Sequence, residues 1–130
     1  MTARLIQYLV LVAIVNVSGR TALAQDFTVA AGGECPGRVT IRWEGAYPNH
    51  HLAVCVGLDL GSTTLPAGPC CGTVMGIRGS LQLVHLIRSG PLGQGRASGQ
   101  ADPTLCGRYL QLIAYTGAYD CPVSNVVQLP

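Results

Sequence analysis

Apolar and polar residues alternate in several short runs along the chain, and turn-forming residues separate these runs. In RVTIRW, residues 38–43, alternation places three large apolar side chains on one face, namely Val39, Ile41 and Trp43. Strict alternation is typical of a strand with one buried face, so we expect Trp43 in the core. HLAVCVGL, residues 51–58, alternates in the same way, with its inward side chains at Leu52, Val54, Val56 and Leu58. Cys55 is therefore expected on the outer face of this strand.

Four further runs are rich in Val, Ile, Leu, Thr and Tyr: TVMGI (73–77), LQLVHLI (81–87), GRYLQLIAYTG (107–117) and SNVVQLP (124–130). The last two are expected to form a hairpin. Residues 59–72 are turn-rich, and 89–103 are loop-like by composition, although their middle fits an edge strand as well. No segment has a helical period. Short strands between regularly spaced turns indicate an all-β domain, a single antiparallel sandwich of the immunoglobulin-like or fibronectin-type-III-like kind.

The N-terminus has the pattern of an export signal. Arg4 supplies a positive charge, residues 5–17 are mostly apolar, and Ala22-Leu23-Ala24 is a small-x-small cleavage site. The apolar run is too short to cross the hydrocarbon layer of a membrane, which is roughly 30 Å thick. We therefore expect a signal peptide at 1–24 and one domain at 25–130, secreted or held in the periplasm or at the cell surface, with no membrane span after cleavage.

Charge narrows the range of partners. The chain has no lysine, and loss of Arg4 and Arg20 with the signal would leave six arginines against six acidic residues. This balance gives no basic footprint for nucleic acid. Charged residues make up only 11% of the chain, so part of the surface is expected to be apolar or uncharged and suited to contact with another molecule.

All six cysteines lie in the expected mature part: Cys35, Cys55, Cys70, Cys71, Cys106 and Cys121. An even number in an exported chain indicates a disulfide framework. Neighbouring Cα atoms are about 3.8 Å apart, too close for an ordinary disulfide, so Cys70 and Cys71 are expected to bond elsewhere. The sequence has no CxxC pair, and its three histidines lack finger-like spacing from the cysteines, so disulfides are preferred to a metal cluster.

The segments CPGRVTIRWEGAYPN, PAGPCCGT, CGRYLQL and CPVSNVVQLP together resemble an uncharacterised family of short, secreted bacterial proteins with a sandwich fold. The resemblance implies fold and location but no activity. Cys55 and Cys71 are additions to the family pattern, which implies that they bond to each other. Cys35 and Cys106, which each precede a strand, are then expected to pair at one end of the sandwich. Cys70 and Cys121 are expected to pair at the other end.

Other patterns are weaker. DLGSTT, within residues 54–64, is similar to the phosphate loop of the actin and heat-shock-chaperone ATPases, but those proteins need two large domains, so a turn is preferred here. The closely spaced glycines at 93–99 lack the strand-to-helix context of a dinucleotide site. Three histidines (His50, His51, His85) and three loop aspartates (Asp59, Asp102, Asp120) form no metal-binding motif. We expect no cofactor, no metal and no enzymatic activity.

The run at 107–117 carries the candidate contact face. If Leu110, Leu112 and Ala114 point inward, the outer face carries Tyr109, Gln111, Ile113 and Tyr115. The opposite register, which buries the tyrosines, is equally compatible with the pattern. The expected function is a non-catalytic interaction or structural module that contacts an unknown extracellular protein or glycan through this face. The alternative is a carrier of a small hydrophobic ligand, similar to the chromoprotein apoproteins; an apolar pocket would favour this alternative.

The cleavage site is directly testable. We expect the exported protein to begin at Gln25, because Ala22 and Ala24 lie at the usual distance beyond the apolar run. Intact-mass measurement of protein recovered outside the cytoplasm gives the result. A species that retains residues 1–24 would contradict the prediction.

Overall fold

The computed structural model describes residues 26–115 and 121–130, and these form an all-β structure. Its strands are β2 (Thr28–Gly33), β3 (Gly37–Glu44), β4 (His51–Gly57), β5 (Asp59–Thr64), β6 (Val74–Arg78), β7 (Gln82–Arg88), β8 (Gly95–Ala101), β9 (Tyr109–Tyr115) and β10 (Val127–Gln128). One short 3₁₀ helix, η1 (Pro103–Leu105), lies between β8 and β9. The expected all-β class is thus confirmed.

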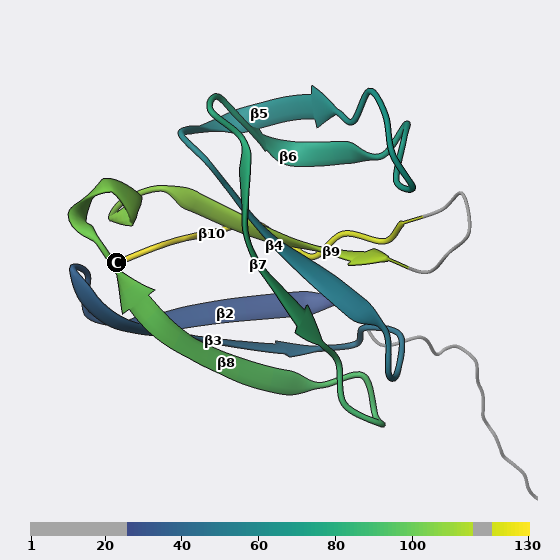
Figure 1. Ribbon diagram of the computed structural model, residues 1–130, viewed down its shortest axis with the longest axis horizontal. Coiled ribbons are helices and arrows are strands. Elements are labelled where there is room, and N and C mark those ends of the chain that lie inside the picture. Colours follow the sequence, from purple (N-terminus) through teal and green to yellow (C-terminus); the bar gives the residue numbers. More distant parts are fainter. Residues whose placement is uncertain (1–25, 116–120) are drawn as a thin grey trace, which may run out of the picture.

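The strands form three antiparallel sheets. The first has the order β10-β9-β4-β7, the second has the order β2-β3-β8, and the third is the β5–β6 hairpin. Figure 1 shows the four-stranded sheet in the middle, with the three-stranded sheet on one side and the hairpin on the other. The fold is therefore sandwich-like, with an additional hairpin layer.

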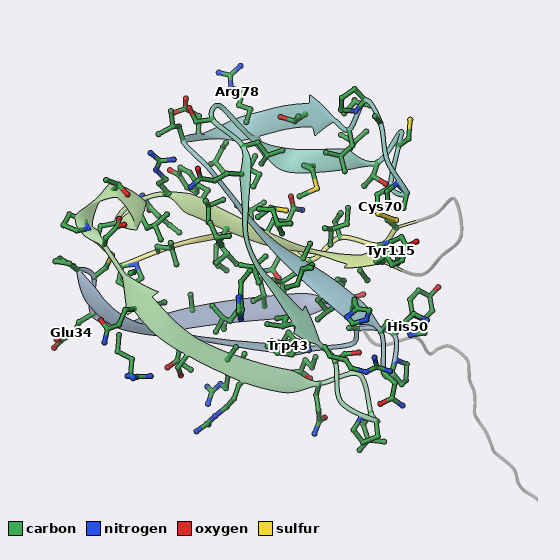
Figure 2. All side chains as sticks on the ribbon, in the orientation of Figure 1. Glu34, Trp43, His50, Cys70, Arg78 and Tyr115 are labelled. Carbon is green, nitrogen blue, oxygen red and sulfur yellow. A yellow bond between two sulfur atoms is a disulfide. The ribbon has the colours of Figure 1, made fainter. Side chains whose placement is uncertain are left out.

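The main core lies between the two larger sheets and follows the predicted alternation. On β3 the buried side chains are Val39, Ile41 and Trp43, and on β4 they are Leu52, Val54 and Val56. Both strands contribute these residues to one core cluster, and Trp43 of β3 is labelled in Figure 2. The expectation for Leu58 is wrong, because β4 ends at Gly57 and the chain turns into β5, leaving Leu58 exposed.

A second core lies between the hairpin and the outer face of the four-stranded sheet. Its buried residues are Cys70, Met75, Ile77, Ile113 and Cys121. Strand β9 contributes to both cores, since Leu110, Leu112 and Ala114 belong to the main core and Ile113 belongs to the second. The middle sheet is consequently covered on both faces along β9.

Two segments differ from the simplest sequence interpretation. Residues 59–64, expected in a turn-rich stretch, form strand β5, which pairs with β6. Residues 95–101, expected in a loop or an edge strand, form β8, which pairs with β3 along its whole length. The side chains of β8 that share a face with Val39, Ile41 and Trp43 are only Gly and Ala, so this strand carries no hydrophobic signal. The predicted pairing of the last two strands is confirmed by β9 and β10.

Covalent and polar links hold the layers together. The Cys35–Cys106 disulfide joins the segment before β3 to the segment before β9, and Cys70–Cys121 joins the hairpin loop to the segment after β9. Each is expected to stabilise the fold by about 2–4 kcal/mol. The Asn125 side chain binds the backbone of β2 near the other end of the chain. Its Oδ1 accepts from Val29 N–H at 2.7 Å, and its Nδ2 donates to the Val29 carbonyl at 3.2 Å.

Gly95 provides a test of the packing around Trp43. A Cβ added at Gly95 would lie 2.5 Å from Trp43 Cζ2, whereas one added at Gly99, on the same face of β8, meets nothing within 4 Å. We expect Gly95→Ala to lower the free energy of unfolding by about 1–3 kcal/mol through overpacking. Gly99→Ala is expected to change it by less than about 1 kcal/mol. Urea unfolding of both variants measures the difference, and equal stabilities would contradict this account of Trp43.

Candidate functional site: a cleft and an exposed strand

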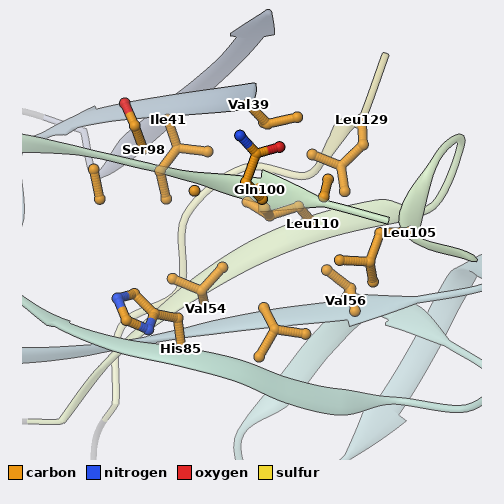
Figure 3. A pocket seen from close by; sticks show the side chains of 14 residues that line it. Val39, Ile41, Val54, Val56, His85, Ser98, Gln100, Leu105, Leu110 and Leu129 are labelled. Atoms are coloured by element: carbon orange, nitrogen blue, oxygen red, sulfur yellow. The ribbon is translucent and has the colours of Figure 1, made fainter. Parts of the chain in front are cut away.

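A cleft opens between β7 and β8, where the edges of the two larger sheets do not close on each other. Its volume is about 260 Å³. The floor is formed by core side chains, namely Val39, Ile41, Val54, Val56, Leu110 and Leu129. Val84 and His85 of β7 border it on one side, and residues 97–101 of β8 border it on the other. Figure 3 labels His85 on the β7 side and Ser98 and Gln100 on the β8 side. This is an apolar space with polar groups near its mouth.

Small side chains on β8 create the cleft. Gly95, Ala97, Gly99 and Ala101 lie opposite the inward residues of β3, so they face the interior. At Gly99 even an added Cβ would meet nothing within 4 Å, so the β8 wall is open at this point. Ala97, the neighbour of Gly99 on this face, adds only a single carbon. The edge of the sandwich is therefore underfilled.

Strand β7 forms the other border and is itself unusually exposed. It is an edge strand that pairs with β4 alone among the described strands. Of its seven residues only Ile87 is half-buried, and the rest are exposed. The exposed fractions of Leu83, Val84 and Leu86 are 56%, 38% and 60%. An apolar edge strand with so much open surface is a candidate site for contact with another molecule.

The two faces of β7 have different surroundings, and a register irregularity at Val84 determines which side chains share a face. His85 pairs with Val54, but Leu83 pairs with Cys55, so Val84 is an extra residue at this point. His85 shares its face with the inward Val54 and lines the cleft. Leu83 and Leu86 lie opposite Cys55 and Ala53, on the outer face that also carries the hairpin. We call Leu83 and Leu86 the β7 outer patch.

The sequence-predicted contact face is covered in the structure. Gln111 and Ile113 have exposed fractions of only 4% and 5%, because β6 of the hairpin lies over them. Gln111 Oε1 accepts from Gly76 N–H at 2.8 Å, and its Nε2 donates to the Ser124 carbonyl at 2.7 Å. Tyr109 is half-buried and Tyr115 is exposed. The predicted face of Tyr109, Gln111, Ile113 and Tyr115 is therefore not open as a unit, and Gln111 acts as a structural link.

Two of the three predicted disulfides are present in the structure. Cys35–Cys106 and Cys70–Cys121 are bonded as expected, but Cys55 and Cys71 are free, so the expected Cys55–Cys71 bond is wrong. Cys55 does point to the outer face of β4, but the hairpin covers that face and Cys55 packs against the second core. Its burial raises the pKa of the thiol. Cys71 is exposed in the hairpin loop, where its Sγ lies 3.5 Å from the Pro66 carbonyl oxygen.

The remaining polar candidates have local roles. His50 Nδ1 lies 2.7 Å from the Pro48 carbonyl oxygen, and His51 is exposed at the start of β4. Asp102 caps η1, since its Oδ1 accepts from Thr104 N–H at 2.9 Å. Hydrogen bonds from Thr104 lower the pKa of the Asp102 carboxyl. Asp59 belongs to strand β5 and not to a loop, and Asp120 lies outside the described residues.

Within residues 26–115 and 121–130, His, Cys, Asp and Glu side chains do not gather in groups of three or more that could hold a metal ion. The DLGSTT run forms β5, where Thr63 Oγ1 donates to the Ile77 carbonyl of β6 at 2.7 Å. This segment is half of a hairpin that covers the second core. In this part of the chain, helices long and apolar enough to cross a membrane are also absent.

No known protein family, no curated protein and no solved structure matches this chain. The site must therefore be interpreted from its own geometry. The cleft between β7 and β8 and the β7 outer patch are both open to other molecules. Periodicity could not identify either one, since β8 lacks large side chains and β7 has a continuous apolar run that suggests burial.

The two free thiols are expected to react very differently. Cys71 should be alkylated by iodoacetamide in the native protein, whereas Cys55 should react slowly, because burial limits access and disfavours its thiolate. Mass spectrometry of peptides labelled before and after denaturation distinguishes the two. Native protection of both thiols would contradict the structure, since it would indicate that they are bonded to each other. Rapid labelling of Cys55 would show that the hairpin does not cover it.

Proposed function

We propose that this chain is an exported, non-catalytic interaction module of the immunoglobulin-like or fibronectin-type-III-like kind. The strand order supports this fold assignment. A three-stranded sheet β2-β3-β8 and a four-stranded sheet β10-β9-β4-β7 correspond to the ABE and GFCC′ sheets of a fibronectin-type-III domain. The β5–β6 hairpin would then be an insertion between strands C and C′. Two disulfides and the N-terminal signal pattern support an oxidising location outside the cytoplasm.

The observation that carries the interaction role is the β7 outer patch. Leu83 and Leu86 are each more than half exposed and lie on one face of an edge strand. Exposing large apolar side chains at an edge invites unwanted association, so their presence favours a partner that covers them. Burial of one such side chain contributes about 1.5–3 kcal/mol, enough for two leucines to act as binding anchors.

The partner is expected to contact side chains more than backbone. The extra residue at Val84 interrupts the regular hydrogen-bonding edge of β7, which weakens long strand addition. No charged residue lies between Leu83 and Leu86, so the contact would be apolar at its centre. An extracellular protein with a complementary apolar surface fits this patch better than a glycan, because the patch has no aromatic ring on which a sugar could stack.

Polar groups near the site support a non-catalytic role. Ser89, which is buried at the end of β7, donates its hydroxyl hydrogen to the Tyr47 carbonyl and accepts from His50 N–H at 3.0 Å. The serine hydroxyl thus holds the turn between β3 and β4 against the end of β7. His50 is engaged with the Pro48 carbonyl. These residues stabilise turns.

The interaction role is tested with a charge placed on the patch. Leu86→Lys is expected to weaken binding of the partner at least about tenfold, which is about 1.4 kcal/mol. Leu92→Lys is the matched control, because Leu92 is 74% exposed but lies in the turn after β7. Both variants should retain stability to within about 0.5 kcal/mol, as expected for surface substitutions.

The measurement uses the immobilised mature protein to capture partners from the culture medium and surface extract of the producing cells. Captured proteins are identified by mass spectrometry, and their affinities for the three proteins are then compared. Loss of binding in Leu86→Lys alone supports the proposal. Equal capture by all three proteins would place the contact elsewhere, and capture of nothing by the wild type would contradict an interaction role.

A further inference from the structure

We infer that the cleft between β7 and β8 binds a small, uncharged molecule with an elongated apolar body, such as a medium-chain alcohol. The cleft is separate from the β7 outer patch, since Val84 and His85 line it while Leu83 and Leu86 lie on the other face of the strand. The inference therefore stands independently of the proposed interaction role.

The dimensions of the cleft indicate the shape of the ligand. Its β8 wall runs from Ala97 to Ala101, four residue steps that span about 13 Å at roughly 3.3 Å per residue. The volume of the cleft is about 260 Å³. A ligand with an extended apolar body can lie along this wall. The volume also exceeds that of an apolar cavity which binds benzene, about 150 Å³.

The chemistry of the lining indicates an uncharged ligand. Among the described residues that line the cleft, none is Asp, Glu, Lys or Arg, and most are aliphatic. A charged group inside would lose its hydration without gaining a counter-charge, which is costly. An alkyl chain on the floor would instead contact Val54, Val56 and Leu110, whose side chains are already part of the main core.

The mouth of the cleft offers hydrogen bonds for one polar head group. His85 is exposed on the β7 side and presents its imidazole there (Figure 3). On the other side, β8 pairs with β3 alone among the described strands, so alternate N–H and C=O groups on its free edge lack a strand partner. A hydroxyl group, which both donates and accepts, fits this mixture of groups.

Gly99 allows the cleft to be filled without damage to the strand. Its φ is not in the left-handed region, and an added Cβ meets nothing within 4 Å. The same holds for Gly32 of β2, which does not line the cleft. Gly99→Ile therefore places a β-branched side chain in the cleft, and Gly32→Ile makes the same chemical change elsewhere.

The experiment titrates the exported protein and both variants with decanol. Binding is followed by the fluorescence of Trp43, the only tryptophan in the chain, and by the rise in melting temperature. We expect decanol to bind the wild type and Gly32→Ile with equal affinity and Gly99→Ile at least tenfold more weakly. Cyclohexanol tests shape, and decanoate and decylammonium test charge; all three should bind the wild type more weakly than decanol.

Each other outcome overturns the inference. No binding of decanol to the wild type, or equal binding to Gly99→Ile, would show that the cleft is not a ligand site. Tighter binding of cyclohexanol or of a charged analogue would refute the ligand class. If Gly99→Ile fails to fold, Gly99→Val provides the same comparison with a smaller side chain. Leu86→Lys should bind decanol normally, so failure of the ligand site and failure of the interaction role are distinguishable.

Discussion

The pairing of β4 with β9 is the constraint on which the rest of the structure depends. These two strands pair continuously from His51 to Gly57, and they are the central strands of the middle sheet. Their inward side chains build the main core, and their outward side chains build part of the second core. A register shift of one residue here would exchange the two sets and disrupt both cores at once. The three-stranded sheet and the β5–β6 hairpin each cover one face of this pair, so the pair constrains where both can lie.

The sequence predicted what lies within single strands better than what covers them. Alternation correctly placed Val39, Ile41 and Trp43 in the core, because each strand of a sandwich has a periodic inner face. It could not reveal that β9 is buried on both faces. Gln111 has the polarity of a surface residue, yet its amide is satisfied by Gly76 and Ser124 inside the protein. The second buried face of β9 is created by the β5–β6 hairpin, which is distant from β9 in the sequence. The local pattern of β9 therefore cannot predict it.

The same limit explains the candidate sites and the cysteines. The cleft arises from what β8 lacks, since glycine and alanine at 95–101 give no hydrophobic signal. The exposure of β7 arises from its position at the edge, although its composition suggests a buried strand. For Cys55 the predicted direction was right, but the space it faces is filled by the hairpin. In each case the missing information is which element lies opposite, and this is a property of the assembled fold.

The Asn125 side chain has a consequence for when the protein can fold. It binds Val29 across 96 positions of the sequence, and β10, even nearer the C-terminus, supplies the last strand of the middle sheet. These hydrogen bonds help to close one side of the sandwich, so a growing chain cannot complete that side before Asn125 has been synthesised.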